Sequence, residues 1–174
     1  MGSASTIIGH YLIGLGSNRP HGRHGRSESV IRAAIEALAE EGLVVRRASR
    51  ILRTPAMGPS DRDFANAAVL IESDLPPPAL LALLQRIEHD FGRRRYRRWG
   101  ARVLDLDILA WGHSGWVSRG LTIPHIGLAT RDFALGPATA VAPGWRHPRH
   151  NLTLRQLHAR LRRPRPVDRR PCIP

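Results

Sequence analysis

The sequence predicts an α+β fold, because strand-forming runs and amphipathic helices follow one another in the order βαββαβ. Strands are expected at residues 10–16, 43–54, 64–73 and 103–110, where apolar and branched side chains dominate between turn-forming segments. One helix is expected between the first two strands and a second between the last two. This order is that of a ferredoxin-like core, with an antiparallel sheet and flanking helices.

Both helices have an apolar face and recognisable end signals. Ser27 is an N-cap candidate for the first helix, and Gly42 stands near its end. The apolar face of this helix is formed by Val30, Ile31, Ala34, Ile35 and Leu38. The prolines at residues 76–78 open the second helix, and Gly92 supplies its stop. Its apolar face is formed by Leu80, Leu81, Leu84, Ile87 and Phe91.

The remaining segments are shorter and less regular. Residues 20–26 are rich in Arg, His and Gly without periodicity, so we expect a mobile loop there. A hairpin-like stretch is expected around residues 112–120, a short helix from about residue 131, and a weak helix at residues 153–162. The chain therefore divides into a flexible N-terminus (1–9), a single domain (10–162) and an Arg/Pro-rich tail (163–174).

Length and composition restrict the classes of protein to consider. The chain has 174 residues, 42% of them hydrophobic and 24% charged, as in one ordinary globular domain. No apolar run approaches the ~20 residues that span a bilayer, and no leader is evident, so we expect a cytoplasmic protein without membrane contact. We also expect a monomer. The single cysteine, Cys172, excludes an intramolecular disulfide and a multi-cysteine metal site.

The net charge of +13 is carried by arginine alone, because the chain contains no lysine. Such a replacement is typical of a compositional bias, so the charge by itself does not indicate binding to nucleic acid. It does favour anionic ligands in general.

The most informative segment joins a block of arginines, residues 93–102, to two carboxylates. Asp105 and Asp107 are separated by one residue within an apolar strand, so their side chains are expected to share one face. Two neighbouring carboxylates repel each other unless a cation lies between them. Mg²⁺ is typically held by one or two carboxylates, with phosphates and water completing its coordination. The segment therefore predicts a magnesium and polyphosphate site.

Two other interpretations of this segment remain open. An arginine run can be a solvated face or a nucleic-acid patch, and two aspartates in a strand can simply pair with arginines. A nucleic-acid module would use the arginines with exposed aromatic residues and would not need paired acids, which argues against it here.

Seven motifs in succession give the chain a resemblance to a known family. They are YLIGLGSN (11–18), TPAMGP (54–59), FANAAV (64–69), LQRIE (84–88), GR (92–93), RWGARVLDLDIL (98–109) and LTIPH (121–125). In this order they resemble hydroxymethyldihydropterin pyrophosphokinase, an enzyme of folate biosynthesis, over roughly residues 10–145.

The resemblance implies a diphosphokinase that transfers the β,γ-diphosphate of ATP to 6-hydroxymethyl-7,8-dihydropterin and releases AMP. It implies two Mg²⁺ ions held by Asp105 and Asp107, in agreement with the interpretation of the residues themselves. It also implies that the arginines contact phosphate oxygens, with Arg93 and Arg102 among the catalytic residues.

The resemblance further implies two substrate sites. The ATP site would contain Gln85, Glu88, Arg95, Arg98, Trp99, Ile108, Thr122, His125 and Arg131. The pterin site would contain Gly16, Thr54, Pro55, Met57, Phe64, Asn66 and Phe133, with the ring between the two phenylalanines. Gln85 and Glu88 can also be ordinary polar helix positions, and His125 can be a turn residue.

The chain departs from the family pattern at a few positions. Ala101 and Val103 stand where the family usually has proline and threonine. These departures leave open a paralogue that acts on a related, modified pterin.

Overall fold

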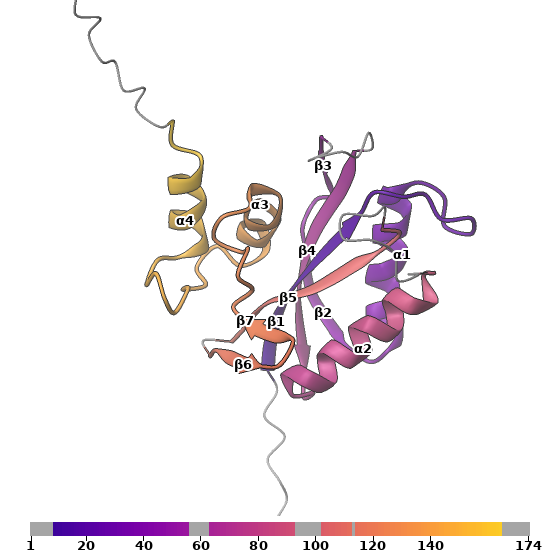
Figure 1. The fold of residues 1–174 in the computed structure, drawn as a ribbon, viewed down its shortest axis with the longest axis horizontal. Helices are drawn as coiled ribbons and strands as arrows, with labels where there is room; N and C mark the ends of the chain where they lie inside the picture. Colours follow the sequence, from indigo (N-terminus) through magenta and orange to yellow (C-terminus); the bar gives the residue numbers. More distant parts are fainter. Residues whose placement is uncertain (1–8, 56–62, 93–101, 113, 165–174) are drawn as a thin grey trace, which may run out of the picture.

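The computed structural model describes residues 9–55, 63–92, 102–112 and 114–164, which contain the predicted core (Figure 1). The strands are β1 (Gly9–Ser17), β2 (Val44–Ala48), β3 (Leu52–Thr54), β4 (Phe64–Ser73), β5 (Asp105–Trp111), β6 (Trp116–Ser118) and β7 (Leu121–Ile123). The helices are α1 (Ser27–Glu40), α2 (Pro77–Asp90), α3 (Asp132–Val141) and α4 (Leu154–Leu161). Residues 1–8 and 165–174 lie outside the described residues, so the predicted ends of the domain stay predictions.

The main sheet has the order β2-β4-β1-β5, and β3 also pairs with β4. All of these pairs are antiparallel. With α1 after β1 and α2 after β4, this is the ferredoxin-like arrangement that the sequence predicted.

The predicted strand at residues 43–54 is in fact two strands, β2 and β3, which pair with different parts of β4. The ladder is interrupted at Ser49. The Ser49 hydroxyl accepts a hydrogen bond from the Ala68 N–H at 3.0 Å, while the Ser49 N–H donates to the Ala68 carbonyl. A side-chain oxygen therefore replaces a backbone acceptor there, and the chain turns before it pairs again.

The two faces of the sheet carry separate hydrophobic clusters. Residues such as Ile13, Leu15 and Val69 pack with α1 and α2, whereas Leu12 and Ala68 pack with α3 and α4. Figure 1 shows the helices in these two layers, one on each side of the sheet. Because side chains alternate along a strand, the face of each residue follows from its place in the strand.

Both core helices end as their glycines predicted. Gly42 has φ +84°, and its N–H donates to the Ala39 carbonyl while the Leu43 N–H reaches the Leu38 carbonyl. This pair of bonds satisfies two carbonyls at the end of α1. The N-cap prediction was wrong by one residue: Arg26 is the N-cap and makes no side-chain cap bond, and Ser27 is the first residue of the helix.

The segment at residues 20–26 contains a regular hydrogen-bonded turn that its composition did not predict. His21 and Gly25 exchange two backbone hydrogen bonds of 2.8 and 2.7 Å, which close a short turn. The rings of His21 and His24 stack, and His24 stacks on Phe91 with centroids 4.9 Å apart. The turn is thus held against the end of α2, and its mobility stays a prediction.

The C-terminal part follows the predictions with one shift. The hairpin pairs β6 with β7 and so lies at residues 116–123 rather than at 112–120. Helices α3 and α4 lie where short helices were expected, and Thr153 begins α4 with a capping box to Gln156. None of the helices in the described ranges has the length and apolar character needed to cross a membrane.

Candidate active site

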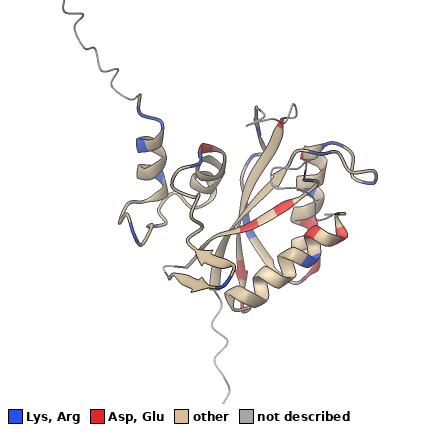
Figure 2. Cartoon of the chain, in the orientation of Figure 1, with Lys and Arg blue, Asp and Glu red and all other residues tan. Residues whose placement is uncertain are grey.

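The predicted acidic pair lies on β5, the edge strand of the sheet next to β1 (Figure 2). Asp105 and Asp107 are half-buried, whereas Leu106 between them is buried in the cluster below α1 and α2. The two carboxylates therefore share the opposite face, which confirms the geometry that the alternation predicted. Leu109, two residues after Asp107 on β5, belongs to the cluster that packs with α3 and α4.

A row of polar residues crosses the sheet beside Asp105. In the strand register Gly16 pairs with Asn66 on one side and with Asp105 on the other. A Cβ at Gly16 would lie 3.5 Å from Asn66 Oδ1 and 3.9 Å from Asp105 Cβ. The glycine therefore leaves space between an amide and a carboxylate, as a flat ligand would need.

The structure brings only some of the other residues predicted for the pterin site close to this row. The buried Asn66 donates through Nδ2 to Thr54 Oγ1 at 2.8 Å, which orients the amide. Phe64 pairs with Thr54 in the register and shares the face of Asn66, and Pro55 is exposed directly after β3. Met57 lies outside the described residues.

Phe133 and Arg131 lie at the start of α3. The Arg131 guanidinium carbon is 5.9 Å from the centroid of the Phe133 ring. Gly127 lets the arginine pass, since a Cβ there would come within 2.8 Å of Arg131 Nε. Helix α3 contacts β3, β4 and β1, but the sandwich of a pterin between Phe64 and Phe133 stays a prediction.

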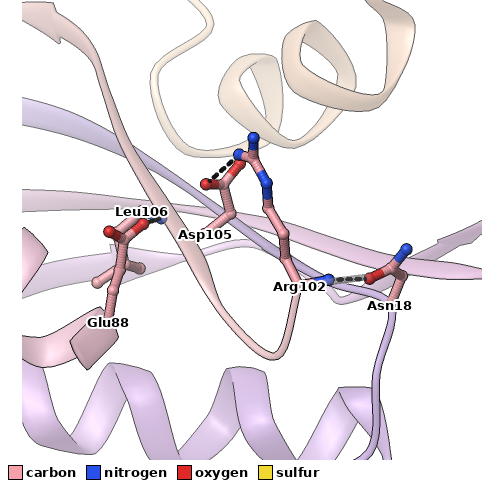
Figure 3. A network of polar contacts seen from close by, with 5 residues as sticks. All are labelled: Asn18, Glu88, Arg102, Asp105 and Leu106. Atoms are coloured by element: carbon pink, nitrogen blue, oxygen red, sulfur yellow. Dashed lines mark hydrogen bonds and ion pairs between the residues drawn. The ribbon is translucent and has the colours of Figure 1, made fainter. Parts of the chain in front are cut away.

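Arg102 lies beside Asp105, and its side chain reaches the carboxylate (Figure 3). Its Nη1 donates to Asp105 Oδ1 at 2.6 Å, with 45% of the arginine side chain and 26% of the aspartate side chain exposed. The alternative interpretation, an aspartate paired with an arginine, therefore holds for Asp105. Since both side chains reach solvent, the pair is accessible to an anion or a metal.

Asn18 contacts Arg102 from the end of β1, and the sequence assigned it no role. The Asn18 N–H donates to the Arg102 carbonyl at 3.1 Å, and Asn18 Oδ1 accepts the Arg102 N–H at 2.6 Å. The signal in the sequence was an asparagine just after a predicted strand, a place where its side chain often bonds to backbone.

Glu88 and Gln85, one turn apart on α2, have different surroundings. Glu88 is 2% exposed, and its Oε1 accepts the Leu106 N–H at 2.7 Å between the two aspartates. Gln85 is exposed. Ile108 is buried in the cluster on the α1 and α2 face, so a role in nucleotide binding would have to use its backbone.

Thr122 and His125 lie beside the outer edge of β5. Thr122 is half-buried on β7, a strand that contacts β5, and the His125 N–H donates to the Leu109 carbonyl at 3.0 Å. His125 Nδ1 accepts the Gly127 N–H at 3.1 Å, so a neutral ring carries its proton on Nε2 and presents a donor. His125 is thus a turn residue whose other nitrogen remains suited to a ligand. Arg93, Arg95, Arg98 and Trp99 lie outside the described residues.

Comparison with known proteins identifies the family to which this site belongs. A family model described as 7,8-dihydro-6-hydroxymethylpterin-pyrophosphokinase (HPPK) matches residues 12–143. The chain belongs to the HPPK family. The matched span contains Gly16, Asn66 and both aspartates, so the row across the sheet lies inside the HPPK domain.

Relatives and solved structures agree with this. A 2-amino-4-hydroxy-6-hydroxymethyldihydropteridine pyrophosphokinase from Synechocystis is 39% identical over 147 residues, which cover 84% of this chain and 73% of the relative. The same enzyme from Methylorubrum extorquens is 40% identical over 133 residues, with 75% and 81% covered. The HPPK-DHPS crystal structure from Plasmodium falciparum matches with a TM-score of 0.65 at 13% identity, over 91% of this chain and 45% of that chain. That likeness concerns the fold.

The carboxylates of this HPPK domain fit a hard divalent ion. They offer oxygen donors from two residues on one face of a strand, and Gly16 leaves space beside Asp105. Among the described residues no cluster of three or more His, Cys, Asp or Glu could enclose a metal. A two-carboxylate set suits Mg²⁺, which keeps water and substrate phosphates in its remaining positions.

Proposed function

We infer that this chain transfers the β,γ-diphosphate of ATP to the hydroxymethyl group of 6-hydroxymethyl-7,8-dihydropterin. The hydroxymethyl oxygen attacks the β-phosphorus, the bond to the α,β-bridging oxygen breaks, and AMP leaves while the hydroxyl proton passes to solvent. The observation that carries this inference is the HPPK family match over residues 12–143, which contains the acidic pair on β5.

The acidic pair would supply the electrostatic part of this reaction. Asp105 and Asp107 would hold Mg²⁺, with two ions expected. Bound Mg²⁺ neutralises charge on the phosphates and aligns the attacking and leaving oxygens. In the absence of an ion, Arg102 neutralises Asp105 through the 2.6 Å contact. Binding of a metal to Asp105 would release the guanidinium for the phosphate oxygens, to which its planar fork is suited.

The row across the sheet would supply the pterin site. Gly16, which has no side chain, would leave room for the ring on the sheet. Asn66, whose amide is oriented by its bond to Thr54, would hydrogen-bond to the polar edge of the ring. Phe64 would stack against one face of the ring, and Phe133 is proposed for the other. The nucleotide would lie beside the outer edge of β5, where His125 offers Nε2–H. The monomeric state and the cytoplasmic location stay predictions.

The test is a product analysis. The purified protein is incubated with ATP, Mg²⁺ and 6-hydroxymethyl-7,8-dihydropterin, and the nucleotide products are separated by chromatography. AMP in equal amount to a pterin diphosphate supports the inference, whereas ADP or no pterin-dependent product contradicts it. A parallel series with modified pterins separates this substrate from that of a paralogue.

A further inference from the structure

Asn18 forms a two-bond clamp on the segment that leads into β5. It is 3% exposed, and both of its clamp bonds go to the backbone of Arg102, 84 residues further along the chain. Figure 3 shows the side-chain half of this clamp beside the pair of Arg102 and Asp105. A buried amide that accepts a short backbone bond restricts the position of that backbone.

In the described structure the clamp is one of three hydrogen-bonded restraints on residues 102–106, in addition to the burial of Val103 and Leu104. The second is the strand register, in which Gly16 pairs with Asp105. The third is Glu88, whose buried carboxylate accepts the Leu106 N–H from the other side of the strand. Asn18 restrains the chain on the N-terminal side of Asp105. It also fixes the backbone position from which the Arg102 side chain extends.

Small displacements of this segment would matter for the reaction. A bound metal ion needs carboxylate oxygens at fixed positions, and a bound phosphate needs guanidinium N–H groups at fixed positions. Loose support of these side chains weakens such sites. Val103 and Leu104 anchor the segment by packing in the core, and the hydrogen bonds at either end fix the backbone that carries Arg102 and Asp105.

We propose that Asn18 is a positioning residue of the transfer reaction, which places the Arg102 guanidinium and the Asp105 carboxylate for phosphate and Mg²⁺ through its clamp on the Arg102 backbone. This inference rests on the proposed function. Asn18 itself touches neither substrate nor metal in this assignment. Its effect is therefore expected on metal binding and on kcat more than on the KM for pterin.

The experiment compares Asn18→Leu, which has a similar size but no acceptor, with Asn18→Asp, which keeps an acceptor oxygen. Ser73→Ala is the matched control, because the buried Ser73 Oγ accepts the Leu75 N–H at 3.1 Å, next to the other end of the sheet. Five quantities are measured: the thermal midpoint, kcat, KM, Mn²⁺ binding by electron paramagnetic resonance with a non-hydrolysable ATP analogue, and amide hydrogen exchange at Arg102.

We expect Asn18→Leu to weaken Mn²⁺ binding and lower kcat by about 10- to 100-fold, as is typical for residues that orient metal ligands. The Arg102 amide should exchange faster in Asn18→Leu, and Asn18→Asp should restore its protection and part of the Mn²⁺ affinity. Ser73→Ala should lower the thermal midpoint without changing Mn²⁺ binding. If Asn18→Leu does not fold, Asn18→Ser, whose hydroxyl is too short for the clamp, replaces it.

Three results would overturn the proposal. The first is an unprotected Arg102 amide in the unchanged protein, and the second is Mn²⁺ binding in Asn18→Leu equal to that in Ser73→Ala. The third is an Asn18→Asp variant as impaired as Asn18→Leu. Failure of the unchanged protein to form AMP would instead refute the proposed function, and so the two failures are distinguishable.

Discussion

Replacing Gly16 by alanine tests the site with little effect on the fold. The new Cβ would lie 3.5 Å from Asn66 Oδ1 and 3.9 Å from Asp105 Cβ, which are ordinary contact distances. The φ angle of Gly16 lies outside the left-handed region, so alanine fits the strand without strain. Such a replacement commonly stabilises a protein by about 0.4–1 kcal/mol, because it reduces the freedom of the unfolded chain.

The same replacement should weaken the binding of pterin. The methyl group would project into the space between the amide and the carboxylate, where the pterin is proposed to lie. One extra methyl in a filled site costs about 1–3 kcal/mol. With 1.4 kcal/mol per factor of ten, this corresponds to a pterin Kd raised about 5- to 150-fold.

The assay measures pterin and ATP-analogue binding by calorimetry and stability by urea unfolding. Gly144→Ala is the control, because Gly144 is exposed and a Cβ there meets nothing within 4 Å. Gly14→Ala gives the contrasting case, since its Cβ would lie 3.1 Å from Leu109 Cδ1 and should lower stability. A Gly16→Ala variant that binds pterin as tightly as Gly144→Ala does would refute the placement of the pterin.

Three further predictions concern the acidic pair, the pterin site and His24. Asp105→Asn or Asp107→Asn should lower kcat at least ~100-fold at saturating Mg²⁺ with the fold retained, because an amide does not neutralise a metal ion; steady-state kinetics and circular dichroism measure this. Asn66→Ala should weaken pterin binding by about 1–3 kcal/mol and relax discrimination among flat heterocycles, whereas Phe133→Ala should weaken all pterins alike; calorimetry separates the two. Burial lowers the pKa of His24, so urea unfolding should show stability falling as the pH drops below the ordinary value of 6.5.

Each of these predictions has a result that contradicts it. Near-normal turnover in both aspartate variants would remove the metal site from β5. A fall in ATP-analogue affinity as large as the fall in pterin affinity would place Asn66 and Phe133 outside the pterin pocket. For the pH effect the control is His89→Gln, at an exposed histidine of α2, and an unchanged pH dependence in His24→Phe would refute the prediction.

The direction of the pH effect follows from the surroundings of His24. Its burial against Phe91, and then the nearby His21 and Arg23, lower its pKa, while Glu36 acts in the opposite direction. The unfolded chain therefore binds more protons than the folded protein below pH 6.5. The stability from this histidine is present above that pH and is lost as the pH falls through the lower pKa of the folded state.

Local patterns were sufficient for the core of the fold. The apolar run between turn-forming segments predicted the bounds of β4, and the alternation in β5 placed both aspartates on one face. The paired glycines at the ends of α1 and α2 marked both stops. These features depend on neighbours a few residues apart, which the sequence contains directly.

Contacts between distant residues could not be predicted in the same way. The clamp of Asn18 on Arg102 and the bond of Glu88 to Leu106 join residues 84 and 18 positions apart, so no local pattern reports them. A mobile loop was expected at residues 20–26, because the stacking of His24 on Phe91, at the end of α2, leaves no local pattern in the sequence. The break at Ser49 likewise depends on its partner Ala68.

The central claim is that Asp105 and Asp107 hold the metal used for diphosphate transfer. It is tested most directly by a crystal structure with Mn²⁺, a non-hydrolysable ATP analogue and the dihydropterin, in which anomalous scattering locates the metal. We expect metal density between the two carboxylates and the phosphates, with the Arg102 guanidinium moved from Asp105 to phosphate oxygens. Metal bound elsewhere, with the 2.6 Å contact between Arg102 and Asp105 intact, would contradict the claim.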